Sequence, residues 1–267
     1  AMPYHWSFSP CSTLRNMAPT KLLVSHKQSC SLSLTCRTYL LPHRSLKSFK
    51  HLDMPAIKTN EDFKISVFIN CPFSEDYSRN FEAIVFTILA FGFVPRCTKE
   101  LLDAGENRFE KIVRIIKDCR LGIHDISETK LDLKNNLPRF NMPFELGVFL
   151  GAKKFGIGTA KLRKTLILDV EQYRYQKFLS DISGNDISIY DGKTQNLIEQ
   201  LYNWLIEETD KEITGYLNLY MIFVEFEKNL PKLCEAKGFD RSRLTFRDLI
   251  RYSVAFLEVN IDRLVNN

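Results

Sequence analysis

The sequence lacks a long uninterrupted apolar run, which argues against a membrane-spanning helix. Such a helix needs roughly 18 consecutive apolar residues. The longest apolar stretch here, 83–94, is interrupted by Thr87 and Gly92. The 267 residues are 45% hydrophobic, which is enough to bury a substantial core. We therefore expect a globular protein of one large or two modest domains, with no membrane partner.

The sequence also lacks a CxxC pair. Its seven cysteines are scattered and odd in number, so they fit neither a disulfide framework nor a zinc site. We therefore expect a reducing compartment, the cytoplasm, and no bound metal.

Acidic residues are nearly absent from the first 53 positions. Residues 1–53 contain seven Lys or Arg and one acid, which leaves 30 basic and 31 acidic residues in 54–267. The formal net charge of +5 therefore comes from the start of the chain. A near-neutral remainder argues against the broad positive surface of nucleic-acid-binding proteins, so we expect no direct nucleic-acid binding.

Segment 1–53 is predicted to be an extension, disordered or non-native, because it shows no sustained helical or strand periodicity. It is rich in Ser and Thr and holds four of the five histidines. One interpretation is a targeting peptide; the other is sequence that precedes a natural start at Met54. In either case we look for function in 54–267.

Short apolar runs alternate with helical patterns between residues 63 and 170. This alternation is typical of a parallel sheet covered by helices on both faces, so we predict a Rossmann-like, flavodoxin-type α/β fold. Strands are expected at 65–69, 93–95, 121–126 and 165–169, with helices at 77–91, at 107–119 and around Glu145.

After residue 170 the pattern becomes helical. We accordingly predict an α/β domain at 54–185 and a helical C-terminal region at 186–267. An aromatic face at 216–226 suits either an intrachain core or a self-association surface. Helices are expected at 173–182, 194–208, 215–237 and 245–264.

Ligands bind outside the carboxyl ends of the strands in open parallel sheets, so the residues after each expected strand are the first candidates. If the first and third strands are neighbours, these groups would form one nucleoside-sized pocket. The candidates are Phe73, Ser74, Arg96, Asp125, Ser127, Arg139 and Asn141.

Several of these residues have a structural alternative. Phe73 would pack on the sheet edge, Ser74 would cap a helix, and Asp125 would brace a loop. His124 lies in an apolar strand and is better explained as a core residue. No histidine is positioned to activate Cys71 as a nucleophile.

Glu145 has the strongest functional signature. An acid in the first turn of a helix can be explained by the helix dipole, which favours it by about 0.3–1 kcal/mol. However, Gly147 and Gly151 follow it at helical spacing, and glycine permits close approach of a backbone or ligand. We therefore predict that Glu145 faces a pocket.

The stretch 139–151, Arg-Phe-Asn-Met-Pro-Phe-Glu-Leu-Gly-Val-Phe-Leu-Gly, resembles the Arg-x-Asn-x-x-Phe-Glu-Leu-Gly motif of bacterial predicted nucleotide-binding proteins with a TIR-like domain. With the Cys-Pro-Phe-Ser loop at 71–74, it is also similar to nucleoside 2-deoxyribosyltransferases. The resemblance covers about 64–170. It departs from the WxxxE form of many eukaryotic TIR domains, which leaves the substrate open.

Both families imply cleavage of a ribosyl N-glycosidic bond, with Glu145 as the catalytic carboxylate that stabilises or captures an oxocarbenium-like state. Nicotinamide leaves NAD as a neutral base and needs no acid. A neutral nucleoside would need a proton donor, for which Asp125 is the candidate. Arg139, Asn141 and Arg96 would bind phosphate or ribose hydroxyls.

The resemblance therefore implies a TIR-like NAD glycohydrolase of bacterial antiviral defence, activated by self-association as a homo-oligomer. NAD would be its substrate, with no cofactor, and another protein of the defence system would be its partner. One alternative is a nucleoside or nucleotide N-ribosyl hydrolase or 2-deoxyribosyltransferase. The other is a non-catalytic nucleotide-binding sensor or adaptor.

Overall fold

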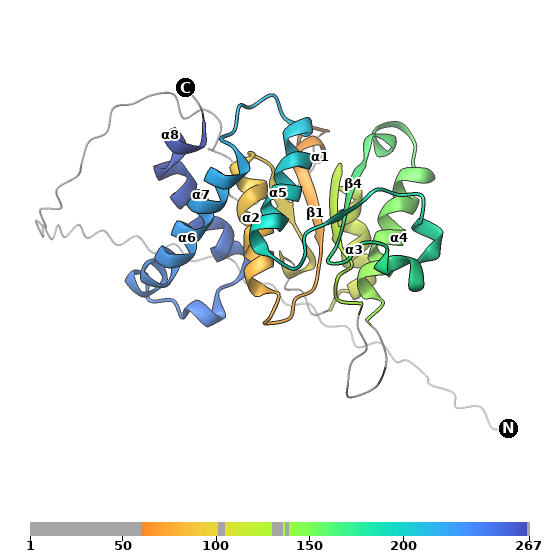
Figure 1. The fold of residues 1–267 in the computed structure, drawn as a ribbon, viewed down its shortest axis with the longest axis horizontal. Coiled ribbons are helices and arrows are strands. Elements are labelled where there is room, and N and C mark those ends of the chain that lie inside the picture. Colours follow the sequence, from red (N-terminus) through yellow and green to blue (C-terminus); the bar gives the residue numbers. More distant parts are fainter. Residues whose placement is uncertain (1–59, 101–104, 130–135, 137–138, 266–267) are drawn as a thin grey trace, which may run out of the picture. The chain divides into compact units, whose positions relative to one another are not determined.

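The computed structural model describes residues 60–100, 105–129, 136 and 139–265, and the extension predicted at 1–53 lies outside these residues. Strands and helices alternate along the first part of the described chain (Figure 1). The strands are β1 (Ser66–Asn70), β2 (Val94–Arg96), β3 (Leu121–Asp125), β4 (Lys164–Asp169) and β5 (Ile187–Ile189). The helices are α1 (Asn60–Ile65), α2 (Ser78–Ala90), α3 (Arg108–Lys117), α4 (Asn141–Lys154), α5 (Thr194–Leu205), α6 (Tyr216–Ala236), α7 (Phe246–Val259) and α8 (Ile261–Leu264).

The five strands form one parallel sheet in the order β2-β1-β3-β4-β5. In the central pair, Val67 lies opposite Leu121 and Asn70 opposite His124. Every residue of β1 and β3 is buried, as expected for strands that are covered on both faces. The predicted Rossmann-like fold is confirmed, and the first and third strands are neighbours.

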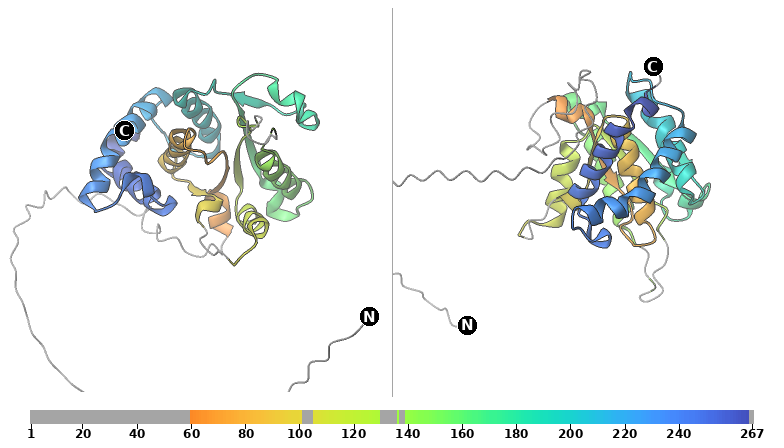
Figure 2. Two further views of the ribbon diagram at one scale, coloured as in Figure 1. Left: turned by 90° about the horizontal axis from the view of Figure 1, so that it is seen from below. Right: turned by 90° about the vertical axis from the view of Figure 1, so that its left-hand side faces the viewer.

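Helices cover both faces of the sheet. Helices α2 and α5 pack on one face, and α3 and α4 pack on the other (Figure 2, left). On the α3–α4 side, Phe68 of β1 stacks on Phe149 of α4 with ring centroids 6.2 Å apart, and both rings are fully buried. Each face of the sheet therefore has its own apolar core.

The C-terminal helices α6 and α7 pack against the outer side of α2. The Phe86 ring of α2 lies 5.6 Å from that of Phe223, 5.0 Å from that of Phe226 and 6.4 Å from that of Phe256. Helix α2 is therefore enclosed between the sheet and these helices, which explains why every residue from Phe81 to Leu89 is buried.

The apolar face of α6 packs inside this chain. Its main side chains, Leu219, Ile222, Phe223 and Phe226, are buried in the core of this chain. The intrachain alternative is thus correct, and the same side chains are not free for self-association.

Two elements differ from the sequence prediction. The helix expected at 173–182 is replaced by two 3-10 turns, Arg174–Lys177 and Ser180–Ile182, because the backbone leaves the helical region at Phe178 and Leu179 between them. Strand β5 was not predicted, since three residues give too little periodicity. Strand β5 and helix α5 continue the α/β layers past residue 185, so the purely helical part begins with α6.

Within the described ranges, none of the helices has the length and apolar character needed to cross a bilayer.

Gly122 in β3 is predicted to be intolerant of any side chain. A Cβ there would lie 2.7 Å from Phe149 Cζ and 2.8 Å from His124 Nε2, both in the core. We expect Gly122→Ala to lower the free energy of unfolding by about 1–3 kcal/mol, measured by urea denaturation.

The matched control is Gly147→Ala in α4, where an added Cβ would meet no described atom within 4 Å. This change should be neutral or stabilising by up to about 1 kcal/mol, because alanine favours helix. Equal stability of the two variants would contradict the packing described for β3.

Candidate active site

The carboxyl ends of β1 and β3 lie side by side at the point where the strand order changes direction. In the order β2-β1-β3-β4-β5, the chain moves outward on one side of β1 and then returns to its other side. Ligands of open α/β sheets bind outside such a switch point. The polar residues that follow these two strands therefore form the candidate site.

The side-chain amide of Asn70, the last residue of β1, joins three elements. Its Nδ2 donates to the carbonyl oxygen of Met142 in the first turn of α4 (2.8 Å) and to Nδ1 of His124 in β3 (3.0 Å). Asn70 is almost fully buried. One N–H bond of this amide thus holds α4, and with it Glu145, against the end of the sheet, and the other joins β1 to β3.

His124 is a core residue, as expected from the sequence. It is fully buried, and burial lowers the pKa of its imidazole to about 3. The Asn70 amide nitrogen can only donate, so Nδ1 of His124 accepts and Nε2 carries the proton. A neutral imidazole with Nδ1 occupied cannot serve as the base at this site.

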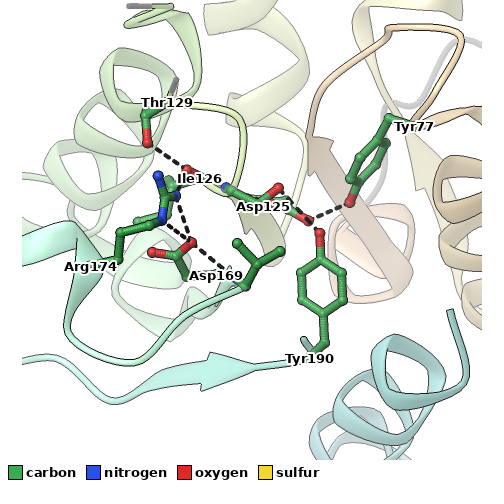
Figure 3. Close-up of polar contacts among 9 residues, drawn as sticks. Tyr77, Asp125, Ile126, Thr129, Asp169, Arg174 and Tyr190 are labelled. Atoms are coloured by element: carbon green, nitrogen blue, oxygen red, sulfur yellow. Dashed lines mark hydrogen bonds and ion pairs between the residues drawn. The ribbon is translucent and has the colours of Figure 1, made fainter. Parts of the chain in front are cut away.

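Asp125, at the end of β3, is engaged on both carboxylate oxygens (Figure 3). Tyr77 donates to Oδ2, and the backbone N–H of Ser127 donates to Oδ1 at 2.8 Å. The Tyr190 hydroxyl, which follows β5, lies 3.2 Å from the Ser127 hydroxyl and also hydrogen-bonds this carboxylate. Burial raises the pKa of Asp125, and these hydrogen bonds oppose that rise.

Arg174 braces the neighbouring strand end (Figure 3). Its Nη2 donates to Asp169 at the end of β4 (2.6 Å) and to the carbonyl oxygen of Ile126 (2.8 Å). The Thr129 hydroxyl donates to the same carbonyl oxygen at 2.9 Å. The carboxyl ends of β3 and β4 are thus fixed by partly buried polar contacts.

Glu145 differs from the other buried acids of the described chain. Asp125 and Asp169 accept the bonds given above, and Glu82 pairs with Arg241 at 2.6 Å. The Glu145 carboxylate is also buried, with 7% of the residue exposed, but no described group donates a hydrogen bond to it. Burial raises its pKa to about 7, opposed by the exposed Arg108 guanidinium at 4.0 Å.

Exposed aromatic side chains flank Glu145. Phe109 of α3 and Phe144 of α4 contact each other with ring centroids 5.6 Å apart, and Phe140 precedes α4. Arg108 and Phe109 were not among the site residues predicted from the sequence. Helix α3 follows β2 and therefore begins at the same sheet edge as α4, which was the available signal.

Cys71 lies close to both candidate carboxylates. Burial raises the pKa of its thiol, and the nearby charges of Asp125 and Glu145 raise it further. A neutral buried thiol is a poor nucleophile, in agreement with the minor role expected for it.

The remaining sequence candidates divide into two groups. The Ser127 hydroxyl is hydrogen-bonded to Tyr190, as described above. Arg139 and Asn141 are exposed where the chain enters α4. Arg96 is buried and held by Glu100, with nitrogen to oxygen distances of 2.6–3.0 Å, so it is not available to a ligand.

Phe73 and Ser74 line a cavity of about 870 Å³ between the β1–α2 loop and segment 240–249. Phe73 packs edge-on against Phe81, with ring centroids 5.4 Å apart. The Ser74 hydroxyl is buried without a partner among the described residues, and α2 begins only at Ser78. Ser74 therefore does not cap that helix.

Comparison of the chain with protein-family models gives no match, and comparison with curated proteins gives none either. In the part of the chain that the structure describes, no three His, Cys, Asp or Glu side chains come together as metal ligands.

Asn70→Ala is expected to destabilise the protein by about 2 kcal/mol, because it leaves the buried Met142 carbonyl and His124 Nδ1 without their donor. The measurement is chemical denaturation. Asn229→Ala is the matched control, since its amide also donates to a carbonyl at 2.8 Å but at the surface of α6. An equal effect of both changes would contradict the role given to Asn70.

Proposed function

We propose that this protein hydrolyses the bond between nicotinamide and ribose in NAD, with Glu145 as the catalytic carboxylate. The observation that carries the proposal is that Glu145 alone among the described buried acids lacks a hydrogen-bond donor. Burying an acid without a donor is costly, so such a group commonly marks a functional site. Its position beside the switch point supports a ligand-binding role.

The reaction needs one carboxylate near the anomeric carbon. The bond between C1′ and the ring nitrogen breaks, its electron pair passes to the nitrogen, and nicotinamide leaves as a neutral base. Ionised Glu145 would stabilise the resulting oxocarbenium charge or capture C1′ as an ester. Water then attacks C1′ and loses a proton, which gives ADP-ribose.

The surroundings of Asp125 favour NAD over a neutral nucleoside as the substrate. A neutral nucleoside requires a proton donor for the leaving base. Asp125 is fully buried, and both its oxygens are engaged by Tyr77 and Ser127. These hydrogen bonds support a structural role for Asp125 and not a role as proton donor. NAD cleavage needs no proton donor, whereas cleavage of a neutral nucleoside does.

Arg108 and Arg139 are exposed at the edge that holds Glu145, and guanidinium groups bind phosphate in a bidentate manner. Phe109 and Phe144 offer apolar rings beside the same carboxylate. These residues are suited to the diphosphate and to an aromatic base. Self-association, a bacterial defence role and a partner protein remain part of the proposal through the sequence resemblance.

Glu145→Gln is expected to lower nicotinamide release from NAD by at least about 10²-fold, because the amide cannot neutralise developing positive charge. The assay should cover a range of protein concentrations, with and without a crowding agent, so that assembly does not limit it. Glu110→Gln, an exposed acid on α3, is the matched control and should keep the parent rate.

The same assay with deoxynucleosides separates the alternatives. Base release from deoxynucleosides alone would assign the protein to the transferase class. NAD binding without turnover in every assembly state would indicate a sensor or adaptor.

The pH dependence of kcat/KM should follow the ionisation of Glu145. Because its pKa lies at about 7 and the charged form is the active one, activity should rise with pH through about 7 and level off above it. Arg108→Gln removes a charge that lowers this pKa, so the midpoint should move to higher pH.

The midpoint is read from rates between about pH 5.5 and 9 and does not depend on the absolute activity of the variant. Arg114→Gln, whose side chain pairs with Glu106 instead, should leave the midpoint unchanged. A midpoint that falls in Arg108→Gln would contradict the assignment.

A further inference from the structure

The turn at 153–164 joins α4 to β4 and combines exposed apolar side chains with positive charge. It has five basic residues and no acid. Phe155 is 87% exposed, Ile157 is 86% exposed and Leu162 is 57% exposed. These are the most exposed large apolar side chains within one short segment of the described chain. We call this segment the basic turn.

The backbone of the basic turn is packed closely. A Cβ at Gly156 would lie 2.4 Å from the carbonyl oxygen of Ala152 and 2.5 Å from Cβ of Ala160. Only glycine therefore lets the 3-10 turn at Gly158–Leu162 approach the last turn of α4. Phe155 and Ile157, on either side of Gly156, are held outward by this contact.

The far end of the basic turn is also anchored. Arg163 is buried, and its Nη2 donates to the carbonyl oxygens of Ile116 (3.2 Å) and Lys117 (3.0 Å) at the end of α3. Lys164 pairs with Glu208 at 2.6 Å. Two of the five cations thus hold the turn in place.

The other three cations are available to a partner. Lys153, Lys154 and Lys161 are exposed, and no carboxylate in the described ranges pairs with them. They lie next to the exposed apolar residues along the chain, Lys154 before Phe155 and Lys161 before Leu162. A surface with exposed lysines and apolar side chains is complementary to a partner that has negative charge at its surface and apolar groups directly below that surface.

The basic turn lies at the sheet edge opposite Glu145. The chain enters α4 at the carboxyl edge and leaves it where β4 begins (Figure 1). Phe155 follows Glu145 by ten positions, which corresponds to about 15 Å along the helix axis. A partner on the basic turn would leave the candidate active site open.

We propose that the basic turn docks on the surface of a bilayer that contains anionic phospholipids. Phe155, Ile157 and Leu162 would enter the headgroup region while the three lysines contact lipid phosphates. Three apolar tips are too few for the roughly 800 Å² per partner of a standard protein interface. The proposal departs from the sequence-based expectation of no membrane partner and does not depend on the proposed reaction.

The test is sedimentation of the full chain with two kinds of vesicle. One is phosphatidylcholine alone, and the other also contains about 30 mol% phosphatidylserine as the anionic lipid. Binding is expected only with phosphatidylserine and should weaken strongly at high salt. Each change of Lys153, Lys154 or Lys161 to Gln should weaken binding about fivefold.

Phe155→Ser with Ile157→Ser should abolish most of the binding without loss of folding, which is checked by circular dichroism and thermal melting. Leu217→Ser with Met221→Ser, a pair of exposed apolar residues on α6, is the matched control and should bind like the parent. All variants retain the basic segment 1–53, so its contribution cancels in the comparison.

Absence of binding to phosphatidylserine vesicles would overturn the proposal. So would equal binding to phosphatidylcholine, or unchanged binding after the lysine and apolar substitutions. Binding to poly-glutamate in place of vesicles would assign the basic turn to an acidic protein partner instead.

Discussion

The amide of Asn70 is the contact on which the candidate site depends. Asn70 is the last residue of β1, and the two N–H bonds of its amide fix the first turn of α4 and the imidazole of His124. The buried side of α4 packs through Phe149 on the sheet, where Gly122 leaves space for the ring. One buried amide and one missing side chain therefore set where Glu145 lies.

The two acids at the carboxyl edge of the sheet, Asp125 and Glu145, differ in their hydrogen bonding. Asp125 is surrounded by Tyr77, the Ser127 N–H and Tyr190, which come from three different segments and brace the edge. Glu145 is buried without such donors and keeps a pKa near neutrality. A fixed edge beside an acid that accepts no hydrogen bond from the described residues is the arrangement expected of a preorganised catalytic group.

The sheet and the carboxylate were predictable from sequence, because buried strands are continuous apolar runs and Glu145 is the one acid of α4. The expected place of Glu145 in the first helical turn was wrong, since α4 begins at Asn141 and Glu145 lies beyond that turn. The residues that contact these carboxylates were harder to predict from the sequence. Arg108 lies 37 residues before Glu145 in the chain and meets it only because α3 and α4 begin at one edge. Tyr190 follows a strand too short to give a pattern, and the pairing of Arg96 with Glu100 depends on side-chain orientation, which spacing does not reveal.

In the proposed reaction, Glu145 faces the anomeric carbon of a ribosyl substrate. The most direct measurement is a crystal structure of the Glu145→Gln variant with NAD bound. We expect C1′ of the nicotinamide ribose to lie within about 3.5 Å of the side-chain oxygen at position 145. Placement of that ribose instead in the cavity lined by Phe73 and Ser74, away from position 145, would contradict it.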